Sequence, residues 1–146
     1  MCAFDDPRAR RFVLRSDAPL DRLPWGLHYW ACKPDLVATR QLLVVQVDMP
    51  PGTGHAFHRH PGREEVLWII QGNGEQWVER EKRQLGPGDS AFIPMDAVHG
   101  LYNDSPRLLR FLAILSPAEA AGPMLVDVYH EEPWKSLRRT TSCPRQ

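Results

Sequence analysis

The sequence predicts an all-β domain, either a sandwich or a barrel, and three observations support this prediction. Short runs of β-branched and aromatic residues recur from residue 41 onward, and turn residues separate them. The chain has 14 prolines and 10 glycines among its 146 residues, which disfavours long helices. A chain of this length forms one domain with a core of its own.

The predicted elements divide this single domain, residues 1–146, into three parts. Residues 1–39 are rich in Arg, Asp, Pro and Trp, and we expect an N-terminal arm with a short strand-like piece at 11–15. Residues 40–116 form the β core, followed by a C-terminal extension at 117–146. Within the core, the expected strands are 41–47, 65–70, 75–81, 90–93, 99–102 and 107–115.

The C-terminal extension begins with a helix signal. Ser116, Pro117, Ala118 and Glu119 have the form of a capping box with proline at the first helical position. Gly122 and Pro123 would end this helix after about one turn. The apolar run at 124–130 can add one more strand, and a short polar tail completes the chain.

The charge balance argues against nucleic-acid and membrane partners, and the cysteine content bears on the compartment. The chain has 18 basic and 18 acidic side chains, so it lacks the basic surface of a nucleic-acid or anionic-membrane binder. No apolar run is long enough to span a membrane. Cys2, Cys32 and Cys143 show no disulfide or zinc spacing, which favours a reducing, cytoplasmic location.

A histidine-rich stretch is the sharpest chemical signal. His58 and His60 are two residues apart, so both imidazoles lie on the same face of a strand. Pro61 and Gly62 make a turn, after which Glu65 can return beside them, and a later strand supplies His99. Three nitrogens and one oxygen form a plausible transition-metal site.

The residues around these ligands resemble the two sequence motifs of the cupin superfamily. The pattern G-x5-H-x-H-x4-E-x6-G matches at Gly52, His58, His60, Glu65 and Gly72, and G-x5-P-x-G-x2-H-x3-N matches at Gly88, Pro94, His99 and Asn103. Asp96 replaces the second glycine of the second motif, and Asp tolerates left-handed geometry better than most residues. The resemblance implies a double-stranded β-helix (jelly-roll) barrel whose metal ligands are His58, His60, Glu65 and His99.

The resemblance leaves several functions open. We expect a metal-dependent enzyme acting on a small molecule, with dioxygenase chemistry slightly favoured and Glu65 serving as a metal ligand or as a catalytic base. A redox-neutral isomerase or lyase for a sugar or keto acid, a non-catalytic binding protein and a purely structural metal are the alternatives. The divalent metal can be Fe, Mn, Ni, Co, Cu or Zn.

The substrate pocket beside the metal is expected to be largely apolar, which favours an aromatic or modestly polar compound over a free sugar. The residues expected to orient the substrate are His55, Arg59, Trp77, Phe92 and Arg110.

Strand alternation also predicts the two faces of the segment after Glu65. With Glu65 inside, Leu67 and Ile69 point inward, whereas Trp68 and Ile70 point outward with Val66. An apolar outer face must be covered, either by the N-terminal arm or by a second subunit. We therefore expect a homodimer.

Overall fold

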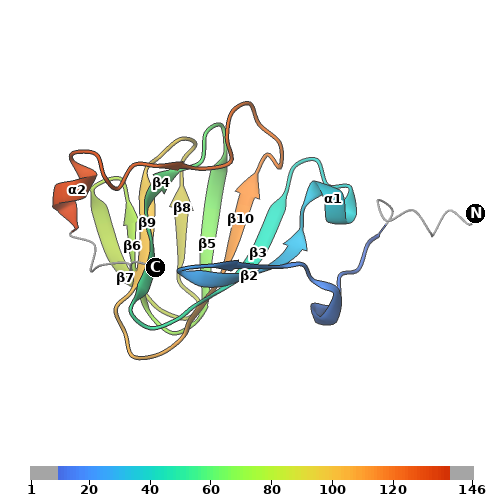
Figure 1. The fold of residues 1–146 in the computed structure, drawn as a ribbon, viewed down its shortest axis with the longest axis horizontal. Coiled ribbons are helices and arrows are strands. Elements are labelled where there is room, and N and C mark those ends of the chain that lie inside the picture. The colour runs from blue at the N-terminus through green and yellow to red at the C-terminus, as the bar shows by residue number, and fades with distance from the viewer. Residues whose placement is uncertain (1–9, 139–146) are drawn as a thin grey trace, which may run out of the picture.

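The computed structural model describes residues 10–138, which form two antiparallel β-sheets that face each other as a jelly roll (Figure 1). The first sheet has the order β1-β2-β3-β10-β5-β8. Its strands are β1 (Leu20–Leu23), β2 (Gly26–Cys32), β3 (Leu43–Met49), β10 (Leu109–Ser116), β5 (Glu64–Gln71) and β8 (Ser90–Ile93). The all-β prediction is confirmed.

The second sheet has the order β11-β4-β9-β6-β7. Its strands are β11 (Val126–Asp127), β4 (Thr53–Arg59), β9 (His99–Asn103), β6 (Gly74–Val78) and β7 (Glu81–Leu85). The two sheets do not close into a continuous barrel, so a cavity can open between them.

The helices of the described residues are short, as the proline and glycine content predicts. They are η2 (Arg15–Asp17), α1 (Pro34–Val37) and α2 (Trp134–Leu137). None of the helices in residues 10–138 is long and apolar enough to cross a membrane.

The main hydrophobic core lies between the sheets. In β5, Leu67 and Ile69 are buried, whereas Trp68 and Ile70 are 47% and 41% exposed, which confirms the predicted alternation. The core also contains buried side chains from β3, β9 and β10, namely Leu43, Val45, Val47, Met49, Leu101, Leu109, Phe111, Ala113 and Leu115.

A second, smaller cluster lies on the outer side of the five-stranded sheet. Phe57 of β4 contacts Trp77 of β6 and Trp134 of α2, with ring centroids 5.5 and 5.4 Å apart. Val128 also packs in this cluster. The C-terminal segment therefore covers the outer face of this sheet, and Figure 1 shows it running in orange and red to the side where α2 lies.

Residues 20–32, which the sequence analysis placed in the N-terminal arm, extend the six-stranded sheet. They form a β1–β2 hairpin, and β2 pairs with β3 through contacts such as His28 opposite Val47. Cys2 and Cys143 lie outside the described residues.

Three local predictions were wrong. Residues 11–15 form no strand. The expected strand at 75–81 is a hairpin, because Glu79 has a φ of 52° and reverses the chain between β6 and β7. The expected helix after Ser116 is absent, because Ser116 remains in the ladder of β10 opposite Glu64.

The possible strand at residues 124–130 is present in part, because only β11, Val126–Asp127, is a strand there.

Gly72, in the turn between β5 and β6, provides a test of the packing. We expect Gly72→Ala to destabilise the fold by about 2–4 kcal/mol in urea unfolding. Its φ is +80°, and an added Cβ would lie 2.3 Å from the carbonyl oxygen of Leu108. The matched control is Gly88→Ala, because Gly88 has a φ of +88° but open space around it. We expect the control to cost only about 1 kcal/mol, and equal costs for the two variants would contradict the packing explanation.

Candidate metal centre

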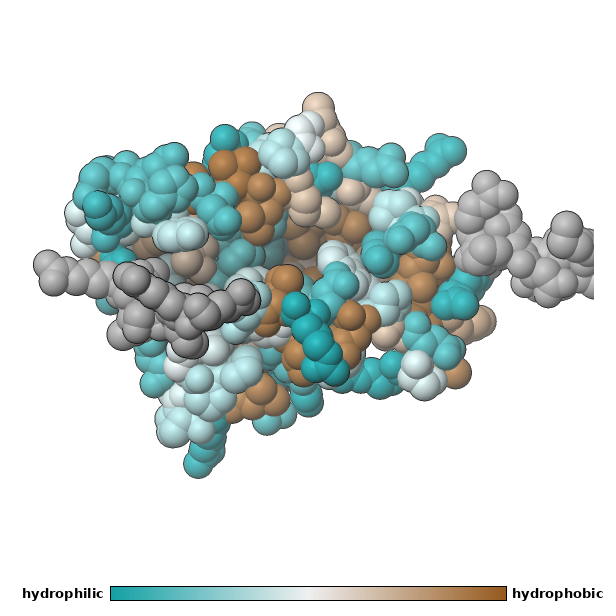
Figure 2. Space-filling model, viewed as in Figure 1, coloured by the Kyte–Doolittle hydropathy of each residue, from teal (hydrophilic) through white to brown (hydrophobic). Residues whose placement is uncertain are grey.

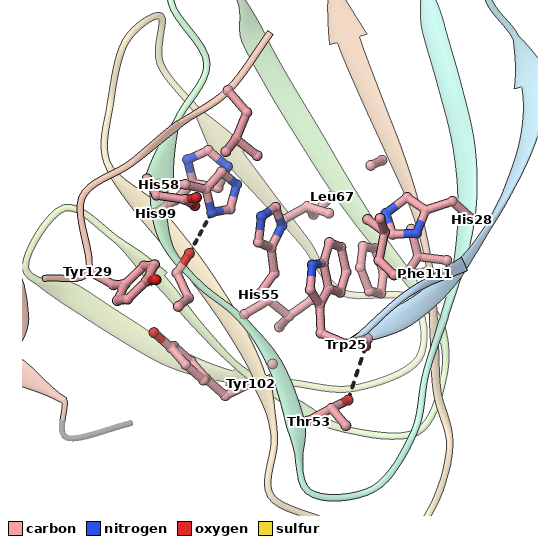
Figure 3. Close-up of a pocket in the computed structure, with 18 of the residues that line it drawn as sticks. Trp25, His28, Thr53, His55, His58, Leu67, His99, Tyr102, Phe111 and Tyr129 are labelled. Carbon is pink, nitrogen blue, oxygen red and sulfur yellow. Dashed lines mark hydrogen bonds between the residues drawn. The ribbon is translucent and has the colours of Figure 1, made fainter. Parts of the chain in front are cut away.

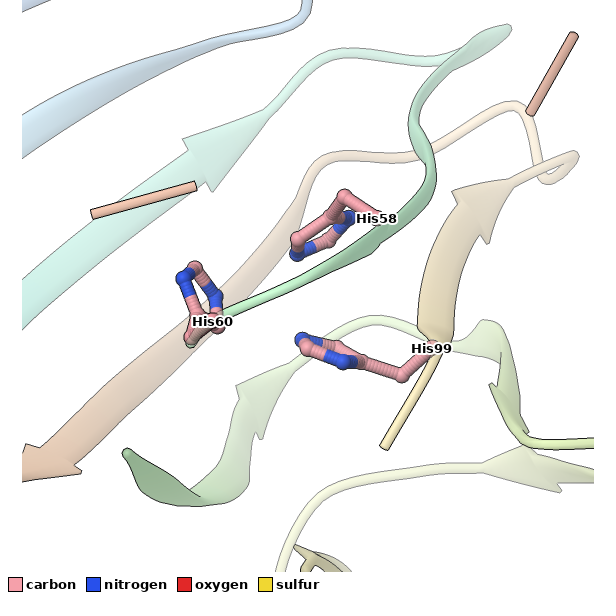
Figure 4. Close-up of side chains that lie close together, drawn as sticks. All are labelled: His58, His60 and His99. Atoms are coloured by element: carbon pink, nitrogen blue, oxygen red, sulfur yellow. The ribbon is translucent and has the colours of Figure 1, made fainter. Parts of the chain in front are cut away.

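Three buried histidines converge between the sheets (Figure 4). His58 lies on β4, His60 directly follows this strand and His99 begins β9. One ring nitrogen of each lies within 4.8 Å of the others. The pairing of β4 with β9 places His58 opposite His99, so the sheet register itself brings together ligands that are 41 residues apart.

Backbone carbonyls orient all three imidazoles. The Nδ1 of His58 lies 2.7 Å from the Ala56 oxygen, and that of His99 lies 3.0 Å from the Ala97 oxygen. The Nδ1 of His60 lies 2.7 Å from the Met124 oxygen. A carbonyl can only accept, so each Nδ1 carries a proton, and each imidazole in its neutral form keeps a free lone pair on Nε2. This is the tautomer that a metal ligand requires.

Glu65 completes the cluster from β5 in the opposite sheet. Its Oε2 lies 2.9 Å from the Nε2 of His99 and 3.2 Å from the Nε2 of His60. The neighbouring Glu64 is exposed, so the structure brings Glu65 and not Glu64 to the histidines.

Burial and mutual contact shift the pKa values of the histidines and of Glu65. Burial lowers the pKa of His58 well below its usual value. Burial alone would raise the pKa of Glu65, but the close approach of the His60 and His99 imidazoles to its carboxylate lowers it strongly. Burial opposes protonation of His60, yet the Glu65 carboxylate raises its pKa overall. The cluster therefore presents a carboxylate and at least one neutral imidazole at neutral pH.

The donor set fits a divalent transition metal. Glu65 Oε2 and His99 Nε2 are both buried and lack a well-aligned hydrogen-bond partner, although they lie 2.9 Å apart. Two buried polar atoms without a hydrogen bond lower the stability of the fold unless another group pairs with them. A cation between the three Nε2 atoms and the carboxylate would satisfy them, and nitrogen with oxygen donors suits the transition metals.

A cavity of about 620 Å³ opens from this cluster between the two sheets. Figure 2, which has the same view as Figure 1, shows a hollow in this face of the molecule with apolar residues around it. One wall is formed by the inner faces of β3, β5 and β10 and is apolar apart from Glu65. It consists of Val45, Val47, Leu67, Phe111, Ala113 and Leu115.

A row of four rings also lines the cavity and runs from β4 of the five-stranded sheet to β2 of the six-stranded sheet (Figure 3). Starting from the ligand His58, the row continues with His55, then Trp25, then His28. Successive ring centroids lie 3.5, 4.1 and 4.6 Å apart, the first two pairs stacked and the last edge-on. Burial lowers the pKa of His55 well below its usual value, so this imidazole is neutral.

A register shift in β4 explains why His55 joins this row. Residues 55 and 58 are three apart, so a regular strand would point them to opposite faces. The β4–β9 pairing is irregular between them: His55 lies opposite Leu101, and His58 lies opposite His99. The extra residue in β4 turns both imidazoles toward the cavity.

The C-terminal segment, residues 124–138, borders the cavity. Met124, Tyr129 and Arg138 line it, and the Met124 carbonyl orients His60. The Arg138 guanidinium lies over the Tyr102 ring at 3.8 Å and is bonded to Glu75 and Asp104. Burial raises the pKa of Tyr102 to about 12, so its hydroxyl keeps its proton.

Of the five residues expected to orient a substrate, His55 alone lines the cavity. Arg59 lies 4.0 Å from Asp96, and Arg110 is paired with Asp48 at 2.7 Å. Trp77 is buried in the cluster behind the second sheet, and Phe92 is 58% exposed on the outer face of the first. These four side chains point away because strand alternation and register place them on other faces.

Sequence reasoning missed several cavity residues. Trp25 and His28 come from the β1–β2 hairpin, Tyr102 occupies an unspecified position of the second motif, and Tyr129 and Arg138 lie outside both motifs. Their local sequence carries no pattern that places them near the histidines. Asp96 behaves as expected: its φ is 64°, and its Oδ1 accepts a hydrogen bond from the Gly62 N–H at 2.9 Å.

Comparison with known proteins identifies relatives of this fold and site. An uncharacterized protein of Aquifex aeolicus is 39% identical over 66 residues, which are 45% of this chain and 54% of that protein. Quercetin 2,3-dioxygenase of Bacillus subtilis is 29% identical over 77 residues, which are 53% of this chain and 23% of the enzyme. The matched segment thus spans about half or less of these relatives.

Solved structures and a family model extend the comparison to the fold. KdgF from Halomonas sp. superposes with a TM-score of 0.64 and 25% identity, covering 74% of this chain and 94% of that one. The family model described as "Cupin domain" matches residues 45–115, which contain all four candidate ligands. The paired sheets, the two motifs and this match together show that the chain belongs to the cupin superfamily.

Proposed function

We propose that this protein is a metal-dependent enzyme that acts on a largely apolar small molecule, with dioxygenase chemistry as its reaction type. The observation that carries the proposal is the placement of the candidate metal centre. The three histidines and Glu65 lie at the wall of a deep cavity that is otherwise lined mainly by apolar and aromatic side chains.

The cavity favours an aromatic or modestly polar substrate. A free sugar needs several polar side chains to pair its hydroxyl groups, whereas the wall formed by β3, β5 and β10 offers only Glu65, which belongs to the candidate metal centre. Arg138 is the only Arg or Lys that lines the cavity within residues 10–138, and it is already paired with Glu75 and Asp104. A strongly anionic substrate would therefore find no free cationic side chain there.

The side chains have distinct roles under this proposal. His58, His60, His99 and Glu65 hold the metal, which supplies Lewis acidity and, if redox-active, reactivity toward dioxygen. Glu65 either stays a ligand or accepts a proton from the substrate; its lowered pKa keeps it ionised but makes it a weak base, which favours the role of ligand. The apolar wall excludes water and holds the substrate against the ring row.

Two other functions remain as alternatives. A redox-neutral isomerase or lyase would use the same ligands to polarise a carbonyl, and a binding protein would use them only to orient a ligand. The similarity of this chain to quercetin 2,3-dioxygenase supports the oxygen-dependent reaction, although the match spans 23% of that enzyme.

Metal content is the first test of the site. We expect near-stoichiometric metal in protein purified without chelator, and we expect the His58→Ala/His60→Ala double variant to lose it, because two of four ligands are removed. Plasma mass spectrometry measures the metal, and circular dichroism checks the fold. His130→Ala is the matched control, since His130 is exposed. Equal metal content in the double variant and the wild type would sink the ligand assignment.

The reaction type is tested next by oxygen uptake with iron-loaded protein. We expect catechols or flavonols to stimulate uptake and to raise the melting temperature, because they are flat, largely apolar and carry adjacent oxygen donors. The double variant should show neither effect. If sugars or uronates alone shifted the melting temperature, the redox-neutral alternative would replace the proposal.

The affinity for metal should depend on pH with a defined sign. Glu65 raises the pKa of His60, so in the metal-free protein this imidazole binds a proton as the pH falls through a value above 6.5. A metal must displace that proton, and affinity for Zn²⁺ should fall about tenfold per pH unit below this pKa and level off above it. Competition titrations with a chromophoric chelator measure the slope, and a flat profile would show that no ligand proton is displaced.

We also propose that the outer face of the six-stranded sheet binds a second copy of the chain. Trp68 lies opposite Leu112 in the strand pairing, and Val66 lies between Ile114 and Phe92. These side chains form an apolar surface on which Trp68 and Phe92 remain 47% and 58% exposed. Among residues 10–138 no segment covers them, so a homodimer is the simplest way to bury this surface.

Trp68→Glu tests the dimer. We expect the variant to shift toward monomer in light scattering, because a buried carboxylate at the centre of an apolar interface has no partner. Leu137→Glu is the control, since it adds the same charge at an exposed apolar position on α2, the helix that packs against the other sheet. An unchanged mass for Trp68→Glu, or an equal shift in the control, would count against this interface.

A further inference from the structure

His28 is a buried polar side chain that the metal site does not use. It lies on β2 and lines the cavity, yet only 8% of its surface is exposed. Its Nδ1 is enclosed by protein beside the Gly26 backbone, so the Nε2 is the ring nitrogen that a ligand in the cavity can reach. A buried imidazole nitrogen that faces a cavity is stabilised by a hydrogen-bonding partner there.

The position of His28 distinguishes it from the metal ligands. The ring row separates it from His58 by two intervening rings, those of His55 and Trp25. In Figure 3, His28 lies at the opposite end of the row from His58 and His99, near Phe111. The row thus has the candidate metal ligand His58 at one end and His28 at the other, with the rings of His55 and Trp25 between them.

The chemistry of His28 limits what it can bind. Burial lowers its pKa, so the imidazole is neutral and offers one donor and one acceptor nitrogen. A neutral imidazole in an apolar pocket pairs well with a hydroxyl or carbonyl group but gives no charge to neutralise a carboxylate or phosphate. The group that it recognises is therefore uncharged.

We propose that His28 forms a second subsite of the cavity, which binds an uncharged hydrogen-bonding group at the far end of an elongated ligand. The ligand carries oxygen donors for the metal at one end, a flat apolar body and a hydroxyl or carbonyl group at the other end. This inference rests on the proposed function, because the metal anchors the first end. It makes His28 a specificity residue for substrate length and for the polarity of the far end.

Two matched probes test the subsite with zinc-loaded protein. The first is 3,4-dihydroxybiphenyl, whose catechol can chelate the metal, and the second is 3,4,4′-trihydroxybiphenyl, which adds one hydroxyl at the far end. By isothermal titration calorimetry we expect the second probe to bind about three- to tenfold more tightly, as one hydrogen bond to a buried partner allows.

Variants assign this preference to His28. His28→Phe should abolish the preference while leaving the affinity for 3,4-dihydroxybiphenyl within about twofold, since the apolar body still fits. His28→Gln should keep most of the preference, and it also serves if the Phe variant does not fold. His130→Phe is the control, because His130 is exposed and does not line the cavity. Nitrogen-15 NMR of the wild type should show the His28 ring resonances shifting with the hydroxylated probe only.

The outcomes separate this inference from the proposed function. Equal affinity of the two probes for the wild type, or a preference that survives in His28→Phe, overturns the subsite and leaves the metal-dependent function in place. Failure of both probes to bind a protein that retains stoichiometric zinc also overturns the subsite. A protein that retains no zinc overturns the proposed function, and the inference falls with it.

Discussion

The register of β4 against β9 is the constraint on which the site depends. It sets His58 opposite His99, and the extra residue in β4 lets His55 face the same cavity. A slip of one residue would turn these imidazoles to the outer face of the sheet, where Phe57 packs against Trp77 and Trp134. The same register thus determines both the candidate metal ligands and the cluster that holds the C-terminal segment in place.

Main-chain carbonyls orient the candidate ligands that this register brings together. Ala56 and Ala97 lie two residues before His58 and His99, so these two imidazoles are oriented by their own strands or the loop before them. His60 differs, because its partner is the carbonyl of Met124, 64 residues later in the chain. The C-terminal segment therefore takes part in the candidate metal centre. The packing of α2 and the ion pairs of Arg138 hold this segment in place, and with it the Met124 carbonyl that orients His60.

The two faces of the six-stranded sheet serve different purposes. Its inner face supplies the apolar wall of the cavity, and its outer face leaves Trp68 and Phe92 exposed. Both faces are apolar along β5, but only the inner one meets the other sheet. The rings of Trp25, His55 and His58 line the cavity near the hairpin and β4, and a flat ligand could lie between them and the apolar wall formed by β3, β5 and β10.

The fold class and the clustering of the candidate ligands could be predicted because they depend on short-range patterns. Strand alternation puts His58 and His60 on one face and points Leu67 and Ile69 inward, and the spacing of the two motifs includes Glu65 and His99. Asp96 could be accepted at a glycine position because Asp tolerates left-handed geometry, and it adopts a φ of 64°. The helix at Ser116 and the strand at 75–81 failed because local signals were overridden by strand pairing and by a turn at Glu79.

The rest of the site depends on contacts between segments far apart in the sequence. The sequence by itself determined an all-β domain with four candidate ligands, since periodicity and spacing act over a few residues. Only the tertiary structure decided that the β1–β2 hairpin brings Trp25 and His28 to the cavity, that Met124 orients His60 and that Trp77, Phe92 and Arg110 point elsewhere. These placements follow from sheet order, a register shift and the path of the C-terminal segment, none of which leaves a local pattern in the chain.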